Sequence, residues 1–192
     1  MDNAENACIE KVLRGEADAY ESLVSRYQAG LVAFLWNLLG NGEDARDATQ
    51  ETFIKAYVSL GRFDRSRSFK TWLFAIAYNR GIDLLRRKRN LLAFWRNETA
   101  GSHPQQSTIA MGPLEQSPLW QPLLTRITAQ ERSVLALKYN EDLGIDEIAA
   151  ALGCSESTVR VHLLNARRKL KKELRAAGFV GAQKRAKAEE AP

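Results

Sequence analysis

The residues whose side chains could catalyse a reaction or bind a metal are few and scattered. The chain has two histidines, His103 and His162, and two cysteines, Cys8 and Cys154. The cysteines are far apart and have no histidine at ligand spacing, so neither a zinc site nor a disulfide framework is expected. The sequence also lacks a glycine-rich loop of the kind that holds phosphate groups. We therefore expect no catalytic site, no metal and no cofactor, and two buried or half-buried thiols.

The charged residues gather in clusters of one sign. The net charge is +5 and the isoelectric point is near 9.3. Basic residues concentrate at 86–89 and 167–172, whereas acidic residues gather at 43–51. Basic clusters suit a nucleic acid, and an acidic face suits a protein partner. Composition alone leaves a second interpretation open, in which all three clusters are solvated helix faces.

Residues 147–159 have the pattern of a helix-turn-helix. Helices are expected over 145–152 and 156–176, with Gly153 in the left-handed turn and Ser155 as the cap of the second helix. A recognition helix presents outward residues to base edges and arginines to phosphates, whereas the alternative is a solvated helical hairpin. The candidate DNA-binding residues are Ser157, Thr158, Arg160, Val161, Leu164, Asn165, Arg167 and Arg168, with Val159, Leu163, Ala166 and Leu170 on the core side.

The first half of the chain also has the periodicity of helices. Apolar residues recur at three- and four-residue steps from Tyr20 to Leu38, before Gly40. A further helix is expected over 43–60, with small residues on its inward side. Its outward side mixes charged and apolar residues, which suits a protein interface better than a solvated face. These outward residues are Asp47, Gln50, Glu51, Ile54 and Val58.

Basic and aromatic residues alternate in the loop 61–67 and in the helix expected after Ser68. Cations that follow phosphates and rings that stack on bases suit single-stranded DNA. Phe69 and Trp72 are expected in the core, whereas the rings of Phe63, Phe74 and Tyr78 could either stack on bases or pack inside. The candidates for single-stranded DNA are Arg62, Phe63, Arg65, Lys70, Phe74, Tyr78, Asn79 and Arg80.

The pattern as a whole predicts an all-α protein. We expect two small helical domains, over 1–89 and 117–177, joined by a flexible linker over 90–116 and followed by a disordered tail over 178–192. The two domains should behave independently unless a partner clamps them, because the stretch Gly101–Thr108 of the linker has few groups able to order it. No apolar run approaches the roughly 20 residues that span a bilayer, and no secretory signal is visible. A cytoplasmic protein without membrane insertion of its own is expected.

Three motifs, in order, resemble the extracytoplasmic function (ECF, group IV) sigma factors of the sigma-70 family. The first motif is Asp44-Ala45-Arg46-Asp47-Ala48-Thr49-Gln50-Glu51-Thr52-Phe53. The second is Arg62-Phe63, Phe69, Trp72-Leu73, Ile76-Ala77, Asn79, Asp83 and Arg86. The third is Glu131-Arg132, Leu135, Tyr139, Glu147-Ile148-Ala149, Leu152-Gly153, Ser155, Thr158-Val159 and Ala166-Arg167. The chain departs from the family at Ile127-Thr128, where Leu-Pro is common, and at Ser157, where Gly is usual.

The resemblance implies a division of labour between two DNA-binding domains. The first would bind core RNA polymerase, at the coiled coil of its largest subunit, through Asp47, Gln50, Glu51 and Ile54. It would also read the −10 element, capture a flipped base and melt the promoter, with Arg86 added to the candidates above. The second would bind the −35 element. The resemblance further implies an anti-sigma factor that masks these faces until a signal arrives.

Two other classes of protein are weighed against this interpretation. An operator-specific regulator that acts without polymerase would share the helix-turn-helix, but it leaves the mixed face of 43–60 unexplained. A small nucleic-acid-processing enzyme would need a nucleophile, a metal cluster or a phosphate loop, none of which the sequence provides. The sequence therefore favours a transcription initiation factor that recognises promoter DNA together with polymerase.

Overall fold

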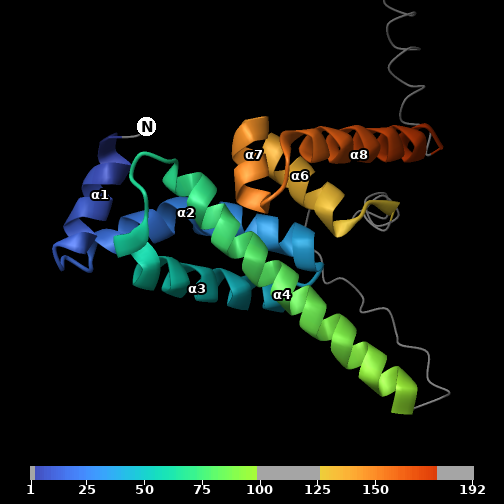
Figure 1. Cartoon of the computed structure of the whole chain (residues 1–192), viewed down its shortest axis with the longest axis horizontal. Helices are drawn as coiled ribbons and strands as arrows, with labels where there is room; N and C mark the ends of the chain where they lie inside the picture. Colours follow the sequence, from blue (N-terminus) through green and yellow to red (C-terminus); the bar gives the residue numbers. More distant parts are fainter. Residues whose placement is uncertain (1–2, 99–125, 177–192) are drawn as a thin grey trace, which may run out of the picture.

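The computed structural model describes residues 3–98 and 126–176 of the chain. Every regular element in these two ranges is helical, which confirms the expected all-α fold. In Figure 1, α1–α4 form one group of helices, and α6–α8 form a second group beside α2 and α4. The helices are α1 (Asn3–Leu13), α2 (Ala19–Leu39), α3 (Gly42–Ser59), the short 3₁₀ helix η1 (Leu60–Arg62), α4 (Phe69–Glu98), α6 (Ala129–Tyr139), α7 (Ile145–Leu152) and α8 (Glu156–Ala176).

A tight connection joins α2 to α3 and makes them neighbours. Gly40 ends α2 in a left-handed conformation with φ 71°, and its N–H donates to the carbonyl of Trp36. The next residue, Asn41, caps α3, because its side-chain oxygen accepts from the N–H groups of Glu43 at 2.9 Å and Asp44 at 3.1 Å. The end of one helix and the start of the next are thus fixed by adjacent residues. The small residues Ala45, Ala48, Thr52 and Ala56 of α3 are all buried, as expected.

Helix α4 begins where the sequence indicates and ends later. The hydroxyl of Ser68 accepts from the N–H of Thr71 at 3.2 Å, so Ser68 caps the first turn of the helix. The helix then continues to Glu98, past the boundary placed at residue 89. That boundary was placed where the apolar periodicity stops, but helix formation does not require periodicity, and residues 90–98 contain neither Gly nor Pro. The rest of the expected linker, the first residues of the expected second domain and the tail over 178–192 lie outside the described residues.

The second group is held together by features that the sequence specifies locally. Thr128 and Glu131 form a capping box at the start of α6, with hydrogen bonds of 3.2 and 2.8 Å. Gly153 has φ 64° at the end of α7, and the Ser155 hydroxyl accepts from the N–H of Thr158 at 3.2 Å. These contacts confirm the helix-turn-helix. The core stripe of α8 is also confirmed, because Val159, Leu163 and Ala166 are buried, whereas Leu170 is half-buried.

The buried carboxylate of Glu131 ties α8 to α6. Lys169 on α8 donates to its two carboxylate oxygens at 2.9 and 2.7 Å. Burial would raise the pKa of Glu131, but the hydrogen bonds from Lys169 and from the backbone of Thr128 outweigh burial and lower this pKa. The carboxylate therefore remains charged, and one side chain both caps α6 and positions the basic part of α8.

The two groups of helices are in direct contact, contrary to the expectation that they are independent. Helix α6 lies on α2, and α7 lies on α4. Arg132 donates to the carbonyl of Asn37 at 2.7 Å, and burial lowers the pKa of its guanidinium. The approach is close, since a Cβ built on Gly30 would lie 2.5 Å from a carboxylate oxygen of Glu141.

Lys70 and Thr71 on α4 complete the contact between the two groups. The ammonium of Lys70 donates to the carbonyl of Glu141 at 2.6 Å and pairs with its carboxylate at 2.9 Å. The Thr71 hydroxyl donates to Glu147 at 3.3 Å. The expectation of independence rested on the composition of the linker, which carries no information about whether the faces of the two groups fit each other.

We predict that Arg132→Ala separates the two groups. In the wild type, the guanidinium of Arg132 donates to the carbonyls of Asn37 and Ile127. The substitution removes both hydrogen bonds, which lowers the stability of the contact by about 1–3 kcal/mol, the range for hydrogen bonds to a charged group. The radius of gyration measured by small-angle X-ray scattering should rise, and amide exchange in α6 and α7 should accelerate.

The matched control is Arg126→Ala, which removes the same charge from the same group of helices. Arg126 is exposed and makes only a 3.9 Å ion pair with Glu173, so its loss should leave both measurements unchanged. Equal radii for wild type and Arg132→Ala, with equal exchange rates, would contradict a role of Arg132 in holding the groups together.

Candidate nucleic-acid and protein interfaces

The outward face of α3 is exposed and partly apolar. Ile54 is 65% exposed and Val58 is 80% exposed, and Tyr57 beside them is 45% exposed. Asp47, Gln50 and Glu51 lie on the exposed side of the same helix. The structure thus agrees with the orientation expected from the sequence. Exposure of the apolar side chains of Ile54 and Val58 to water does not stabilise the helix. A face of this kind therefore suits a protein partner that would cover it.

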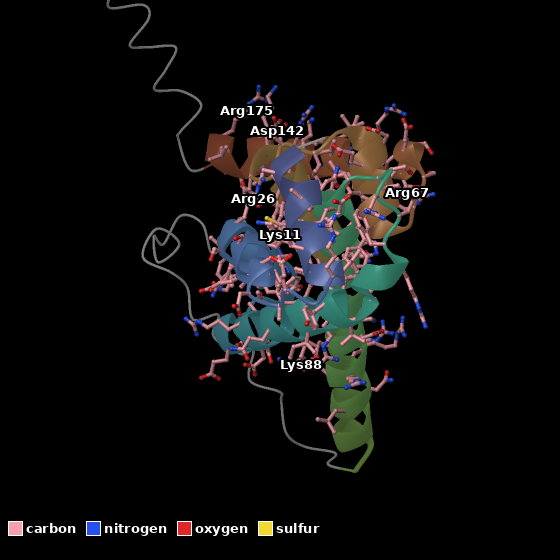
Figure 2. All side chains as sticks on the ribbon, turned by 90° about the vertical axis from the view of Figure 1, so that its left-hand side faces the viewer. Lys11, Arg26, Arg67, Lys88, Asp142 and Arg175 are labelled. Carbon is pink, nitrogen blue, oxygen red and sulfur yellow. The ribbon has the colours of Figure 1, made fainter. Side chains whose placement is uncertain are left out.

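Acidic residues of α3 are paired with basic residues of α4. The guanidinium of Arg80 contacts both carboxylate oxygens of Glu51, and its Nη2 donates at 2.7 Å. Lys88, labelled in Figure 2, pairs with one carboxylate oxygen of Asp44. Glu51 was assigned to a protein partner and Arg80 to DNA. The sequence did not indicate that these two residues neutralise each other, because they lie 29 positions apart.

Two of the rings assigned to single-stranded DNA belong to the core. Phe74 is 0% exposed and packs edge-on against Phe34, with ring centroids 5.3 Å apart. Phe63 is 8% exposed and lies 5.0 Å from the ring of Trp72. Of the two alternatives for these rings, the structure has packing inside, which corrects their inclusion among the DNA candidates. Removing an apolar ring from water is favourable. Phe69 is fully buried, as expected, whereas Trp72 is only half-buried.

The other residues assigned to single-stranded DNA lie in three different environments. Tyr78 is half-buried, and burial raises the pKa of its phenol. Lys70 is half-buried and held by Glu141, as described above. Arg65 reaches Glu10 at 3.1 Å, and Arg86 reaches Asp83 at 3.4 Å on its own helix. The residues whose side chains are exposed are Arg62, Arg65, Asn79 and Arg86.

Helix α8 presents a mixed polar and apolar face to solvent. Leu164 is 67% exposed and Val161 is 54% exposed. Ser157, Arg160, Arg167 and Arg168 are exposed as well, whereas Thr158 and Asn165 are half-buried. The expected orientation is thus correct for the apolar residues and the arginines. Such a face offers hydrogen-bonding groups, methyl groups and cations together, which is the chemistry that reads the major groove.

The arginines on α8 differ in their partners. Arg160 is paired with Glu156 at 2.7 Å, one turn away on the same helix. Arg167 instead donates to the hydroxyl of Tyr139, at the end of α6. The sequence offered no signal for this contact, since Tyr139 and Arg167 belong to different helices.

Two features are absent from the part of the chain that the structure describes. Within 3–98 and 126–176, no group of three or more His, Cys, Asp or Glu side chains could hold a metal ion. None of the helices in these ranges combines the length and apolar character needed to cross a bilayer. The candidate surfaces in these ranges are the outward faces of α3 and α8 and the exposed cations around η1 and α4.

The comparison with known proteins decides the family. Residues 23–91 match the family model of Sigma-70 region 2, and residues 121–170 match that of Sigma-70 region 4. The ECF RNA polymerase sigma factor SigW of Bacillus subtilis is 31% identical over 180 residues, which are 87% of this chain and 95% of SigW. The chain belongs to the ECF sigma factors of the sigma-70 family. It is accordingly a transcription initiation factor that directs RNA polymerase to promoters, and the family consists of transcription factors rather than catalytic enzymes.

Other relatives agree with this assignment of the ECF sigma factor. The sigma factor YlaC of Bacillus subtilis is 33% identical over 161 residues, covering 82% of this chain and 92% of YlaC. Among solved structures, CnrH in complex with the cytosolic domain of CnrY has a TM-score of 0.66 at 26% identity, over 91% of this chain and 99% of CnrH. RpoE of Bartonella quintana in complex with the anti-sigma factor NepR shares the fold, with a TM-score of 0.67 at 23% identity over 81% of this chain and 96% of RpoE.

We predict that Phe74→Ala destabilises the sigma factor strongly, whereas Arg62→Ala does not. Removing a buried Phe costs about 3–5 kcal/mol, because it leaves a cavity, and exposed substitutions change stability by about 0.5 kcal/mol or less. Urea unfolding followed by circular dichroism measures both. Phe74→Ala with wild-type stability would place this ring on the surface and restore its assignment to DNA.

Proposed function

We propose that three surfaces of this sigma factor divide the work of initiation. The outward face of α3 binds core RNA polymerase. Cations around η1 and α4 hold the non-duplex DNA of the −10 element. The outward face of α8 binds the −35 element in the major groove. The observation that carries this proposal is that each candidate helix buries one face in a core and leaves a chemically suited face exposed.

The polymerase surface consists of Asp47, Gln50, Glu51, Ile54 and Val58. The two exposed apolar side chains would be removed from water in a complex, which contributes roughly 1.5–3 kcal/mol for each one that becomes fully buried. The charged residues around them would set the register of docking, since complementary charges favour one orientation over others. The family assignment supports core polymerase as the partner.

The −35 surface combines specific and non-specific contacts. Val161 and Leu164 can contact the methyl groups of thymine, and Ser157 and Asn165 can hydrogen-bond base edges. Arg168, further along the helix, suits a phosphate. Because Val159, Leu163 and Ala166 are buried on the opposite side, the helix can enter the groove without exposing its own core.

The −10 surface is smaller than the sequence indicated. Phe63 and Phe74 are omitted because they are buried. Tyr78 is the remaining aromatic candidate for a flipped base, and Asn79 is exposed one residue further along. The cations that can follow the phosphates are Arg62, Arg65, Lys70, Arg80 and Arg86.

Regulation by an anti-sigma factor in the cytoplasm is part of the proposal. The similar protein CnrH was solved in complex with the cytosolic domain of CnrY. Because α6 and α7 contact α2 and α4, an anti-sigma factor could bind both groups of helices at once. The alternative function is an operator-specific regulator that acts without polymerase. It does not explain why the apolar side chains of Ile54 and Val58 are exposed.

We predict that Ile54→Ser combined with Val58→Ser weakens binding to core polymerase about tenfold or more. The fold should be unaffected, because both side chains are exposed. Native mass spectrometry measures holoenzyme formation, and run-off transcription on a promoter library measures initiation. A matched control is Leu91→Ser, since Leu91 is 58% exposed on α4 and lies outside the proposed surfaces.

Two outcomes would count against the proposal. If the double variant bound core polymerase like the wild type, α3 would not be the docking surface. If the folded wild-type protein gave no discrete start sites with core polymerase on any promoter, the three-surface scheme would be wrong.

The internal ion pairs suggest an order of assembly, with polymerase before DNA. Glu51 holds Arg80, and Glu141 holds Lys70. Both cations belong to the proposed −10 surface, so part of this surface is neutralised in the free protein. Polymerase docking on α3 would compete for Glu51 and release Arg80 to bind a phosphate. Exchange is feasible because an ion pair with an exposed carboxylate contributes only about 0–1 kcal/mol.

We predict that Glu51→Gln increases the affinity of the free sigma factor for a single-stranded oligonucleotide about two- to fivefold. The plot of log affinity against log salt should steepen by about 0.7, the value for one additional phosphate contact. Fluorescence anisotropy at two salt concentrations measures both quantities. Asp47→Asn is the control, because Asp47 carries the same charge on the same helix and forms no ion pair among the described residues. Equal effects of the two substitutions would show that only net charge matters.

A further inference from the structure

Tyr139 is an exposed aromatic residue that none of the three surfaces includes. It ends α6 and is 59% exposed, so it contributes little to the core. Its hydroxyl accepts two hydrogen bonds from the guanidinium of Arg167 on α8, from Nε at 2.8 Å and from Nη2. The guanidinium carbon also lies 5.6 Å from the centroid of the tyrosine ring. Two kinds of contact thus hold one arginine in one place.

The direction of the hydroxyl proton follows from these contacts. A guanidinium only donates, so both of its hydrogen bonds occupy lone pairs of the phenol oxygen. The O–H of Tyr139 must therefore point away from Arg167. Among the described residues it finds no acceptor, and Arg167 has no carboxylate partner. This distinguishes the pair from Arg160 and Lys169, whose charges are neutralised by Glu156 and Glu131.

The pair therefore presents hydrogen-bond donors and no acceptor to the solvent. Tyr139 occupies the Nε–Nη2 edge of the guanidinium, so the N–H groups of the Nη1–Nη2 edge remain free beside one positive charge. A ligand for such a site has several acceptor oxygens and a negative charge, which describes a phosphodiester. A carboxylate side chain would satisfy the same donors, but the described residues place none there.

The position of the pair identifies which phosphodiester it would meet. Arg167 follows Leu164 by three residues and Arg160 by seven, so the three side chains share one flank of α8. Leu164 is 67% exposed on the face proposed to enter the major groove. A DNA strand that borders that groove passes this flank, at a distance of about 10 Å along the helix from Arg160.

We propose that Tyr139 and Arg167 form a binding site for one backbone phosphate of promoter DNA at the edge of the −35 contact. Arg167 donates to the phosphate through its free Nη1–Nη2 edge, and Tyr139 holds the guanidinium in place through the two hydrogen bonds to its hydroxyl. This inference rests on the proposed function of α8. It assigns to Tyr139 of α6 the positioning of a DNA-binding arginine, in addition to the structural part of α6 in the helix-turn-helix.

The test compares wild-type holoenzyme with holoenzyme that contains Tyr139→Phe, on duplex promoters at two salt concentrations. The substitution keeps the ring beneath the guanidinium and removes only the hydroxyl. Affinity should fall about three- to tenfold for all promoter sequences alike. Arg167→Ala should lower the salt slope by about 0.9, the value for one phosphate. In an Arg167→Ala background, Tyr139→Phe should have almost no further effect.

Asn140→Ala is the matched control. Asn140 is an exposed neighbour on the same turn, and the variant should bind like the wild type.

A chemical change in the DNA identifies the phosphate directly. Methylphosphonate linkages, which lack the negative charge, are placed one at a time along both strands of the −35 region. One position should weaken the wild type while leaving the Tyr139→Phe, Arg167→Ala double variant unaffected.

Several results would overturn the proposed site. Tyr139→Phe could bind like the wild type at both salt concentrations, or change sequence preference instead of overall affinity, or no such methylphosphonate position could exist. In each case, specific binding by the wild type would leave the proposed function of α8 intact. Wild-type holoenzyme that binds no promoter would overturn both.

Discussion

Helix α2 has to be covered on several sides, because its apolar residues are not confined to one stripe. Phe34, Leu35 and Trp36 are consecutive and all buried, so no single neighbour can cover them. Helices α1, α3, α4 and α6 all contact α2. The positions of the other helices follow from this requirement. Helix α3 lies against one side and keeps its opposite side free, and α4 crosses so that Phe74 can reach Phe34 (Figure 1). The contact with α6 brings the second group of helices onto the first.

Many basic side chains of this sigma factor form ion pairs with acidic side chains of the same chain. Several cations proposed to bind DNA are paired with acidic residues of the same chain, as in Lys70 with Glu141, Arg80 with Glu51 and Arg160 with Glu156. Pairs with exposed carboxylates are weak, because water screens them and flexible side chains lose entropy when they are held. For Arg80 and Arg160, whose carboxylate partners are exposed, exchange of the carboxylate for a DNA phosphate therefore costs little free energy. A protein with a net charge of +5 can in this way limit non-specific binding to nucleic acid and still provide cations when its partners are present.

Local signals in the sequence predicted the individual helices well. Gly40 and Gly153 end helices in left-handed conformations, and Ser68, Thr128 and Ser155 cap the helices that follow them. Each of these features depends on residues within a few positions of one another, which explains why they can be recognised without a structure. The inward and outward faces of α3 and α8 were also correct, because a period of 3.6 residues fixes which side chains share a face. The end of α4 was misjudged, since the stop of a periodic pattern is not the stop of a helix.

The sequence by itself determined where most helices begin, which faces of α3 and α8 point outward, and to which family the chain belongs. It could not determine which face meets which. Only the tertiary structure buried Phe63 and Phe74 instead of exposing them, joined Arg132 to Asn37 across the two groups, and set Arg167 against Tyr139. The physical reason is the range of the interactions. Caps and helical periods arise between neighbours in sequence, whereas core packing and these hydrogen bonds form between residues that the folded chain alone brings together.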